Sequence, residues 1–234
     1  MIESGFVREN VEDIRKRVAE AAKRSGRDPQ EITVIAVTKT VEPLLINKAV
    51  EEGFFDLGEN RVQELMEKYD KIDDRCKWHI IGQLQTNKVK YIVDKVTMVH
   101  SLDRLELAEE LNKRCIQKGR VMDVLVQVNV SGEATKSGIS PLIVSEFMKS
   151  VSHLGNIKVR GLMTIAPYTT DLEETRAVFR GLRNIFIDIG KENIDNIDMH
   201  YLSMGMSNDF ETAIEEGANL IRIGTSIFGV RKYR

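Results

Sequence analysis

The hydrophobic residues of this chain switch between two spacings. Val11, Ile14 and Val18 recur at the three- and four-residue spacing of a helix, and the pair Ser25-Gly26 predicts its end. The β-branched run at residues 32–37 is instead typical of a strand that is buried on both faces. Short strands and helices then alternate toward the C-terminus, which predicts an α/β protein built on a parallel sheet.

The alternation predicts eight strands with seven helices between them. We expect the strands at residues 32–37, 54–57, 78–81, 97–100, 121–130, 159–163, 199–202 and 220–223. We expect the helices at residues 43–52, 61–70, 87–94, 103–118, 141–153, 172–188 and 208–216. About 200 residues follow the first helix, roughly 25 for each pair of strand and helix, which is enough for a (β/α)8 barrel.

The structural alternative is an open, doubly wound sheet. Such a sheet would carry a glycine-rich fingerprint after its first strand, whereas the stretch Val37-Thr38-Lys39-Thr40 contains no glycine. We therefore predict one domain over residues 1–234, a closed TIM barrel with an extra N-terminal helix (residues 1–28) packed on it.

Composition and charge exclude several classes of protein. The 34 basic and 36 acidic residues give a net charge of −2, which argues against a nucleic-acid or anionic-membrane partner. No apolar stretch approaches the roughly 20 residues of a membrane helix, and the charged N-terminus lacks the apolar core of a secretory signal. Cys76 and Cys115 have no CxxC partner, so we expect no metal site and no disulfide framework. These features predict a cytoplasmic protein, and in the absence of an interface motif we expect a monomer.

In a TIM barrel, function is expected where the strands end at their carboxyl side. Lys39 directly follows the first strand, and partial burial there would favour its neutral amine, which can attack a carbonyl carbon and form a Schiff base. The alternative is a lysine that reaches solvent or pairs with an acid such as Glu59. Polar side chains also follow later strands: Asn60, Gln83, Gln85, Asn87, Lys88, Asn129, Ser131, Lys136, Ser203, Ser207 and Asn208.

The loops after the last two strands together predict a phosphate site. Ser207 follows a glycine-containing turn, and we expect it to cap the helix at residues 208–216. Gly224 and Thr225 lie in a second loop of small residues after the last strand. Barrels frequently bind phosphate with these two loops. Because barrel closure sets strand eight beside strand one, the phosphate would lie close to Lys39.

Arg222 is the third element of the predicted site. It alternates with Ile221 and Ile223, so its side chain points to the opposite face, the crowded barrel interior, where an arginine needs an acceptor. An unprotonated ring nitrogen is one candidate acceptor, and a carboxylate such as Asp198 or Glu59 is the other. Position alone does not separate these two interpretations.

Seven motifs, in order along the chain, resemble those of a known family. They are VIAVTK (34–39), GENRVQE (58–64), WHIIGQLQTNK (78–88), VNVSGEATKSG (128–138), GLMT (161–164), LSMGMSND (202–209) and RIGTSIFG (222–229). The sequence resembles the pyridoxal phosphate (PLP) homeostasis proteins of the YggS type over nearly its whole length.

The resemblance implies a fold similar to the barrel domain of alanine racemase, with PLP as cofactor at the carboxyl ends of the strands. It implies a Schiff base between PLP and Lys39 and an arginine, Arg222, that faces the pyridine nitrogen. It further implies a phosphate site formed by Ser207, Gly224 and Thr225, with Asn60 and Met204 lining the pocket. The family is associated with vitamin B6 and amino-acid homeostasis, and PLP-dependent apoenzymes are the partners that this association suggests.

We expect a carrier or regulator rather than an enzyme. A guanidinium cannot give up its proton to the ring nitrogen, which weakens PLP as an electron sink. Racemases that resemble this fold add a second domain with a tyrosine base, whereas only five residues follow Gly229. The tyrosines available here are Tyr168, Tyr201 and Tyr233, and no motif marks any of them as a base. A PLP-dependent racemase or decarboxylase and a class I aldolase remain the alternatives.

Other residues carry secondary hypotheses. Lys136 is a second amine that could relay the aldehyde, with a solvated surface lysine as the alternative. The basic C-terminus, residues 231–234, could contact the phosphate from outside or simply fray. We expect Trp78 and His79 to be packing residues.

Overall fold

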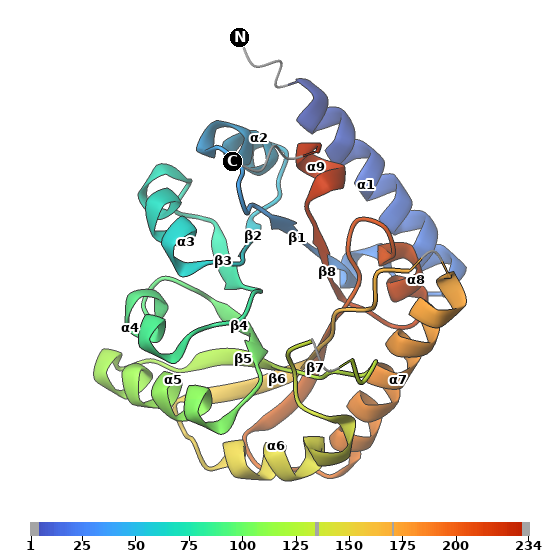
Figure 1. The fold of residues 1–234 in the computed structure, drawn as a ribbon. Coiled ribbons are helices and arrows are strands. Elements are labelled where there is room, and N and C mark those ends of the chain that lie inside the picture. Colours follow the sequence, from blue (N-terminus) through green and yellow to red (C-terminus); the bar gives the residue numbers. More distant parts are fainter. Residues whose placement is uncertain (1–4, 134–135, 170, 231–234) are drawn as a thin grey trace.

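The computed structural model describes residues 5–133, 136–169 and 171–230. Within these ranges, eight parallel strands close into a barrel in chain order (Figure 1). They are β1 (Thr33–Val37), β2 (Asp56–Glu59), β3 (Lys77–Ile80), β4 (Met98–Leu102), β5 (Met122–Gln127), β6 (Ile157–Met163), β7 (Ile197–Ser203) and β8 (Leu220–Ile223). The predicted (β/α)8 barrel is therefore confirmed, and the open sheet is excluded.

Helices cover the outside of the barrel (Figure 1). They are α1 (Gly5–Arg24), α2 (Pro43–Glu51), α3 (Val62–Lys68), α4 (Val89–Ile92), α5 (Leu105–Lys118), α6 (Val144–Ser152), α7 (Leu172–Lys191), α8 (Phe210–Glu215) and α9 (Thr225–Phe228). The short helix α9 follows β8, where the sequence predicted only a loop. Across the described ranges, no helix combines the length and apolar character needed to cross a bilayer.

Several strand boundaries differ from the prediction, and two of these differences have an identifiable local reason. Strand β2 begins two residues late because Phe54 packs into the outer core, and pairing with β3 starts at Asp56. Strand β5 ends at Gln127 instead of residue 130 because the chain turns there. The side-chain oxygen of Asn129 accepts the N–H of Gly132 (3.1 Å), a turn that competes with strand pairing.

Barrel closure joins the two ends of the sequence. Strand β1 pairs with β8 in parallel, with Thr33 opposite Leu220 and Ala36 opposite Ile223. The residues that follow β1 therefore lie beside the residues that follow β8, although about 185 positions separate them in the chain.

The core has two layers, as the period-two alternation of the strands requires. The larger layer lies between the barrel and its helices, and Ala36 and Leu57 belong to it. The smaller layer fills the barrel interior with apolar side chains from five strands: Ile35, Met98, Leu125, Met163 and Leu220. Each strand thus sends alternate residues to opposite faces, and this fixes which polar residues can enter the barrel.

Helix α1 lies outside the barrel and packs against α8 and α9 (Figure 1). Its inner face is fully or almost fully buried: Val7, Val11, Ile14, Val18, Ala21 and Ala22. Polar contacts add to this packing: Asn10 of α1 donates to the Ile227 carbonyl of α9 (3.0 Å), and Arg27, after α1, donates to the Ala218 carbonyl, after α8 (2.7 Å). The N-terminal helix is therefore docked on the segments that carry the last two loops.

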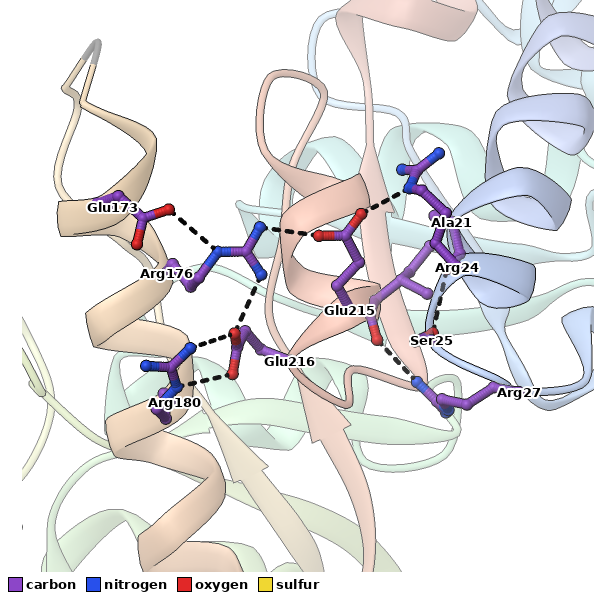
Figure 2. Close-up of polar contacts among 10 residues, drawn as sticks. Ala21, Arg24, Ser25, Arg27, Glu173, Arg176, Arg180, Glu215 and Glu216 are labelled. Atoms are coloured by element: carbon purple, nitrogen blue, oxygen red, sulfur yellow. Dashed lines mark hydrogen bonds and ion pairs between the residues drawn. The ribbon is translucent and has the colours of Figure 1, made fainter.

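An ionic network links α1, α8 and α7 (Figure 2). Glu215 at the end of α8 accepts from Arg24 of α1 (2.8 Å) and from Arg176 of α7 (2.8 Å). The neighbouring Glu216 accepts from Arg176 (3.1 Å) and Arg180 (3.0 Å). The two glutamates thus tie both flanking helices to the segment that leads into β8.

Candidate functional site

A cavity of about 750 Å³ opens at the carboxyl ends of the strands. This volume lies within the range of small-molecule sites, about 300–1,000 Å³. Its walls include six of the predicted site residues: Lys39, Asn60, Ser207, Arg222, Gly224 and Thr225. The seventh, Met204, does not line the cavity, since its side chain is fully buried in the outer core.

Ser207 connects the loops that follow β7 and β8. Its hydroxyl oxygen accepts the backbone N–H of Gly224 (3.3 Å) and that of Ser226 (3.4 Å). The expectation that Ser207 caps the helix at residues 208–216 is wrong. Helix α8 starts only at Phe210, after Asp209, whose carboxylate accepts the Met206 N–H instead. Ser207 therefore holds together the two loops that the sequence assigned to a phosphate.

Arg222 reaches the cavity from inside the barrel. Only 4% of its surface is exposed, and its guanidinium donates to the Ser203 hydroxyl (2.6 Å) and the Thr164 carbonyl (2.8 Å). Burial lowers the pKa of Arg222 to about 10, against the opposing pull of Asp209, so the guanidinium remains charged at neutral pH. Among the described residues, its two hydrogen-bond partners are neutral oxygens, which leaves its other N–H groups for a ligand.

The carboxylates proposed as alternative partners of Arg222 are bonded elsewhere. Asp198 pairs with Arg160, and Glu59 pairs with Lys68 (2.7 Å). The interpretation in which either acid neutralises Arg222 is therefore wrong.

A chain of hydrogen bonds runs behind Arg222 through the barrel interior. The Ser203 hydroxyl contacts Nδ1 of His100 (3.1 Å), Nε2 of His100 contacts Nδ1 of His79 (3.0 Å), and Nε2 of His79 contacts Asp56 (3.0 Å). From the sequence, we expected His79 to be a packing residue. The ring is 97% buried as expected, but it is a polar link between strands rather than an apolar filler.

One set of tautomers satisfies every link of this hydrogen-bond chain with both rings neutral. In this set Ser203 accepts from the guanidinium and donates its own hydroxyl proton to His100 Nδ1, which is unprotonated. His100 therefore carries its proton on Nε2 and donates it to His79 Nδ1. His79 in turn donates from Nε2 to the Asp56 carboxylate. Every donor in this series of hydrogen bonds points away from the cavity.

Lys39 is half-buried on the cavity wall next to β1. The alternative in which Lys39 pairs with Glu59 is wrong, because the Glu59 carboxylate forms its ion pair with Lys68. In the part of the chain that the structure describes, no salt bridge involves Lys39. Its side chain lines the cavity, and among the described residues no carboxylate forms an ion pair with its amine.

Several other predicted polar residues line the cavity, and others do not. Gln83, Asn129, Lys136 and Asn208 line it. Gln85, Asn87, Lys88, Ser131 and Ser203 do not. Lys136 is bonded to Glu133 (2.6 Å), and its side chain is 23% exposed. The basic residues 231–234, and with them Tyr233, lie outside the described residues.

The sequence did not reveal the wall formed by residues 165–169 or the part that Gln127 contributes. Tyr168 belongs to that wall although it is 96% exposed. The position of Gln127 at the carboxyl end of a strand was a usable signal. The loop after β6 carries no such pattern, because its residues meet the cavity only through the path of the folded chain.

Comparison with known proteins places this fold and cavity in a family. Residues 8–232 match the family described as alanine racemase, N-terminal domain. The pyridoxal phosphate homeostasis protein of Aquifex aeolicus is 46% identical over 226 residues, which cover 96% of this chain and 98% of that protein. This chain belongs to the pyridoxal phosphate homeostasis proteins. The predicted family resemblance is confirmed.

Solved structures agree with the architecture of this chain. PipY of Synechococcus elongatus, solved with PLP bound, has a TM-score of 0.80 at 33% identity, covering 91% of this chain and all of PipY. Alanine racemase from Corynebacterium glutamicum has a TM-score of 0.74 at 12% identity, covering 98% of this chain and 62% of the racemase. At that identity the racemase supports the fold alone.

Proposed function

We propose that this chain binds PLP and holds it as a Schiff base on Lys39. One observation carries the proposal: the pairing of β1 with β8 brings the Lys39 amine, the loop pair Ser207–Gly224 and the Arg222 guanidinium to one cavity. PLP has three matching groups, an aldehyde, a phosphate and a pyridine nitrogen. The PLP-bound structure of PipY supports the same ligand.

The chemistry assigned to Lys39 is a condensation. The neutral amine donates its electron pair to the aldehyde carbon, a carbon–nitrogen double bond forms, and the aldehyde oxygen leaves as water. Ser207, Gly224 and Thr225 would hold the phosphate through hydroxyl and backbone N–H groups, and Asn60 would line the ring. Met204 would support this wall from the core behind it.

Arg222 would donate a hydrogen bond to the pyridine nitrogen. Its pKa of about 10 leaves the proton on the guanidinium at neutral pH, so the nitrogen stays unprotonated. An unprotonated ring is a weaker electron sink for reactions at an amino-acid substrate. This favours storage of the cofactor over turnover.

The role proposed for the chain is that of a carrier or regulator in vitamin B6 and amino-acid homeostasis, without catalytic turnover. It would act as a cytoplasmic monomer and pass PLP to apoenzymes by exchange of one amine for another on the aldehyde carbon. The relatives are named as homeostasis proteins, which supports this role. Lys136 also lines the cavity, so it could serve as the second amine during transfer.

One observation favours a second function, a PLP-dependent racemase or decarboxylase. Tyr168 places a phenol on the cavity wall, where a general base would have to lie. Its exposure of 96% argues against this role, because a side chain in open solvent is not held in a fixed orientation toward a substrate.

An absorption spectrum combined with a turnover assay separates these functions. If the chain is a carrier, we expect an imine band with PLP that Lys39→Ala abolishes. We then expect no racemisation or decarboxylation of amino acids. A racemase or decarboxylase predicts the same band together with turnover that Tyr168→Phe removes. A class I aldolase predicts that a keto compound is trapped on Lys39 in the absence of PLP.

A further inference from the structure

The backbone immediately after Lys39 is strained. Thr40 has a φ of 59°, in the left-handed region that β-branched residues avoid. In the described ranges, the other non-glycine residues with positive φ are asparagines, Asn193 and Asn196, which tolerate this region. Strain of this kind persists only where surrounding contacts enforce it, and it is concentrated at functional sites.

Glu64 of α3 enforces the strained turn. Its carboxylate accepts the backbone N–H of Thr40 at 2.7 Å. Burial alone would raise the pKa of Glu64, but the hydrogen bonds from Thr40 and Lys68 lower it overall, so the group is ionised at neutral pH. A charged acceptor makes this hydrogen bond stronger than one between neutral groups.

Lys68, one turn further along α3, holds the other side of Lys39. Its ammonium group donates to the Thr38 carbonyl (2.8 Å), to Glu59 (2.7 Å) and to Glu64 (3.1 Å), which uses all three of its protons. The Thr38 hydroxyl also donates to Glu59 (2.7 Å). Thr38, Glu59 and Lys68 are almost completely buried.

These contacts lie on the opposite side of the barrel wall from the cavity. Alternation along the chain turns the Thr38 side chain outward to Glu59 and the Lys39 side chain inward to the cavity. The peptide groups on both sides of Lys39 are therefore held from α3, while its own side chain is left unbonded by this cluster.

We propose that Glu64 and Lys68 are positioning residues for Lys39: they fix the two peptide groups that flank it and so set the direction in which its amine enters the cavity. The inference rests on the proposed function of Lys39. This orientation would speed imine formation, because an amine that already points toward the aldehyde does not have to be ordered when PLP binds.

The test compares four proteins: the unchanged chain, Glu64→Ala, Glu64→Gln and Glu67→Ala. Glutamine keeps an oxygen that can accept the Thr40 N–H. Glu67 is an exposed glutamate on the same helix and serves as the matched control. Two quantities are measured for each: the rate of imine formation with PLP, and the affinity for pyridoxine 5′-phosphate, which has the ring and the phosphate but no aldehyde.

We expect Glu64→Ala to slow imine formation by about tenfold or more, since misplacement by about 1 Å can cost a hundredfold. Glu64→Gln and Glu67→Ala should stay within about twofold of the unchanged chain. The affinity for pyridoxine 5′-phosphate should be equal in all four proteins. A structural role alone would instead weaken that affinity in parallel with the rate.

Imine formation by Glu64→Ala at the unchanged rate overturns the inference and leaves the proposed function intact. A parallel loss of pyridoxine 5′-phosphate affinity also overturns it, as does a Glu64→Gln variant that is as slow as Glu64→Ala. If the unchanged chain forms no imine at all, the proposed function of Lys39 fails, and this inference fails with it.

Discussion

Side chains that never reach the cavity set the state of those that do. Arg222 is oriented by Ser203 and Thr164, and Ser203 is in turn bonded to a pair of histidines that ends at Asp56. A TIM barrel interior is normally filled with apolar residues, and each buried polar group there needs a partner. In this barrel the partners form a series of hydrogen bonds, so the direction of each hydrogen bond depends on the protonation of the next group.

The histidine chain makes a prediction at the level of single protons. His100 should carry its proton on Nε2 and donate it to Nδ1 of His79, an arrangement that nitrogen NMR of the imidazole rings measures directly. Burial lowers the pKa of His100 well below its usual 6.5, and the nearby guanidinium of Arg222 acts in the same direction. His100 should therefore remain neutral as the pH is lowered through 6. Titration of His100 near 6.5, or a proton on its Nδ1, would contradict the assigned chain.

At the scale of elements, α1 is held by two kinds of contact of unequal strength. Its inner face buries a continuous apolar stripe, whereas Arg24 and Glu215 form an ion pair at the surface. Burial of a large aliphatic side chain contributes several times more than an exposed ion pair. The helix covers α8 and α9 from outside, so its attachment also stabilises the loops that Ser207 connects.

Substitutions on α1 should separate these two contributions. Ile14→Ala removes a fully buried side chain and should lower the free energy of unfolding by about 2–5 kcal/mol. Arg24→Ala breaks a pair whose arginine is 50% exposed and should cost about 1 kcal/mol or less. Urea unfolding measures both. A larger loss for Arg24→Ala would mean that the network, and not the apolar face, holds the helix.

The ionic network also predicts a dependence of stability on pH. Hydrogen bonding from Arg176, followed by that from Arg24, lowers the pKa of Glu215 despite partial burial. A carboxyl with a lowered pKa in the folded state stabilises the protein above its unfolded pKa, about 4.3, and loses that effect as the pH falls through the folded value.

Glu215→Gln cannot titrate, so it is the matched comparison for this effect. The difference in unfolding free energy between the unchanged chain and Glu215→Gln should be largest near neutral pH, about 1 kcal/mol or less, and should shrink below about pH 4. Urea unfolding at a series of pH values checks this. A difference that stays constant from pH 7 to pH 3 would show that the Glu215 charge contributes nothing.

At the scale of the whole molecule, the topology could be predicted from the sequence because the alternation of strands and helices is periodic. The β-branched runs and the helical spacing between them were sufficient to predict eight units, and closure then placed Lys39 beside Gly224 and Thr225. The two loops proposed to hold the phosphate could be located for the same reason, since they lie at fixed positions relative to the strands. The prediction that Ser207 caps a helix was wrong, because a contact between two loops has no signature in sequence spacing.

Contacts across the barrel could not be predicted. Alternation shows that Arg222 and His100 face inward, but it does not show that Ser203 lies between them. Likewise, nothing in Val37-Thr38-Lys39-Thr40 indicates that Thr40 has a positive φ, because the constraint comes from Glu64 on α3. Such features depend on which strands and helices meet in space. A single sequence does not specify the individual contacts between them.

The most direct measurement is borohydride reduction of the protein mixed with PLP, followed by peptide mapping. Reduction fixes an imine at the lysine that formed it, so the modified peptide names the residue. We predict a phosphopyridoxyl group on Lys39 that is lost in Lys39→Ala and retained in Lys136→Ala, whose lysine lines the same cavity. Modification of Lys136 or another lysine with Lys39 intact, or no modification at all, would contradict the account.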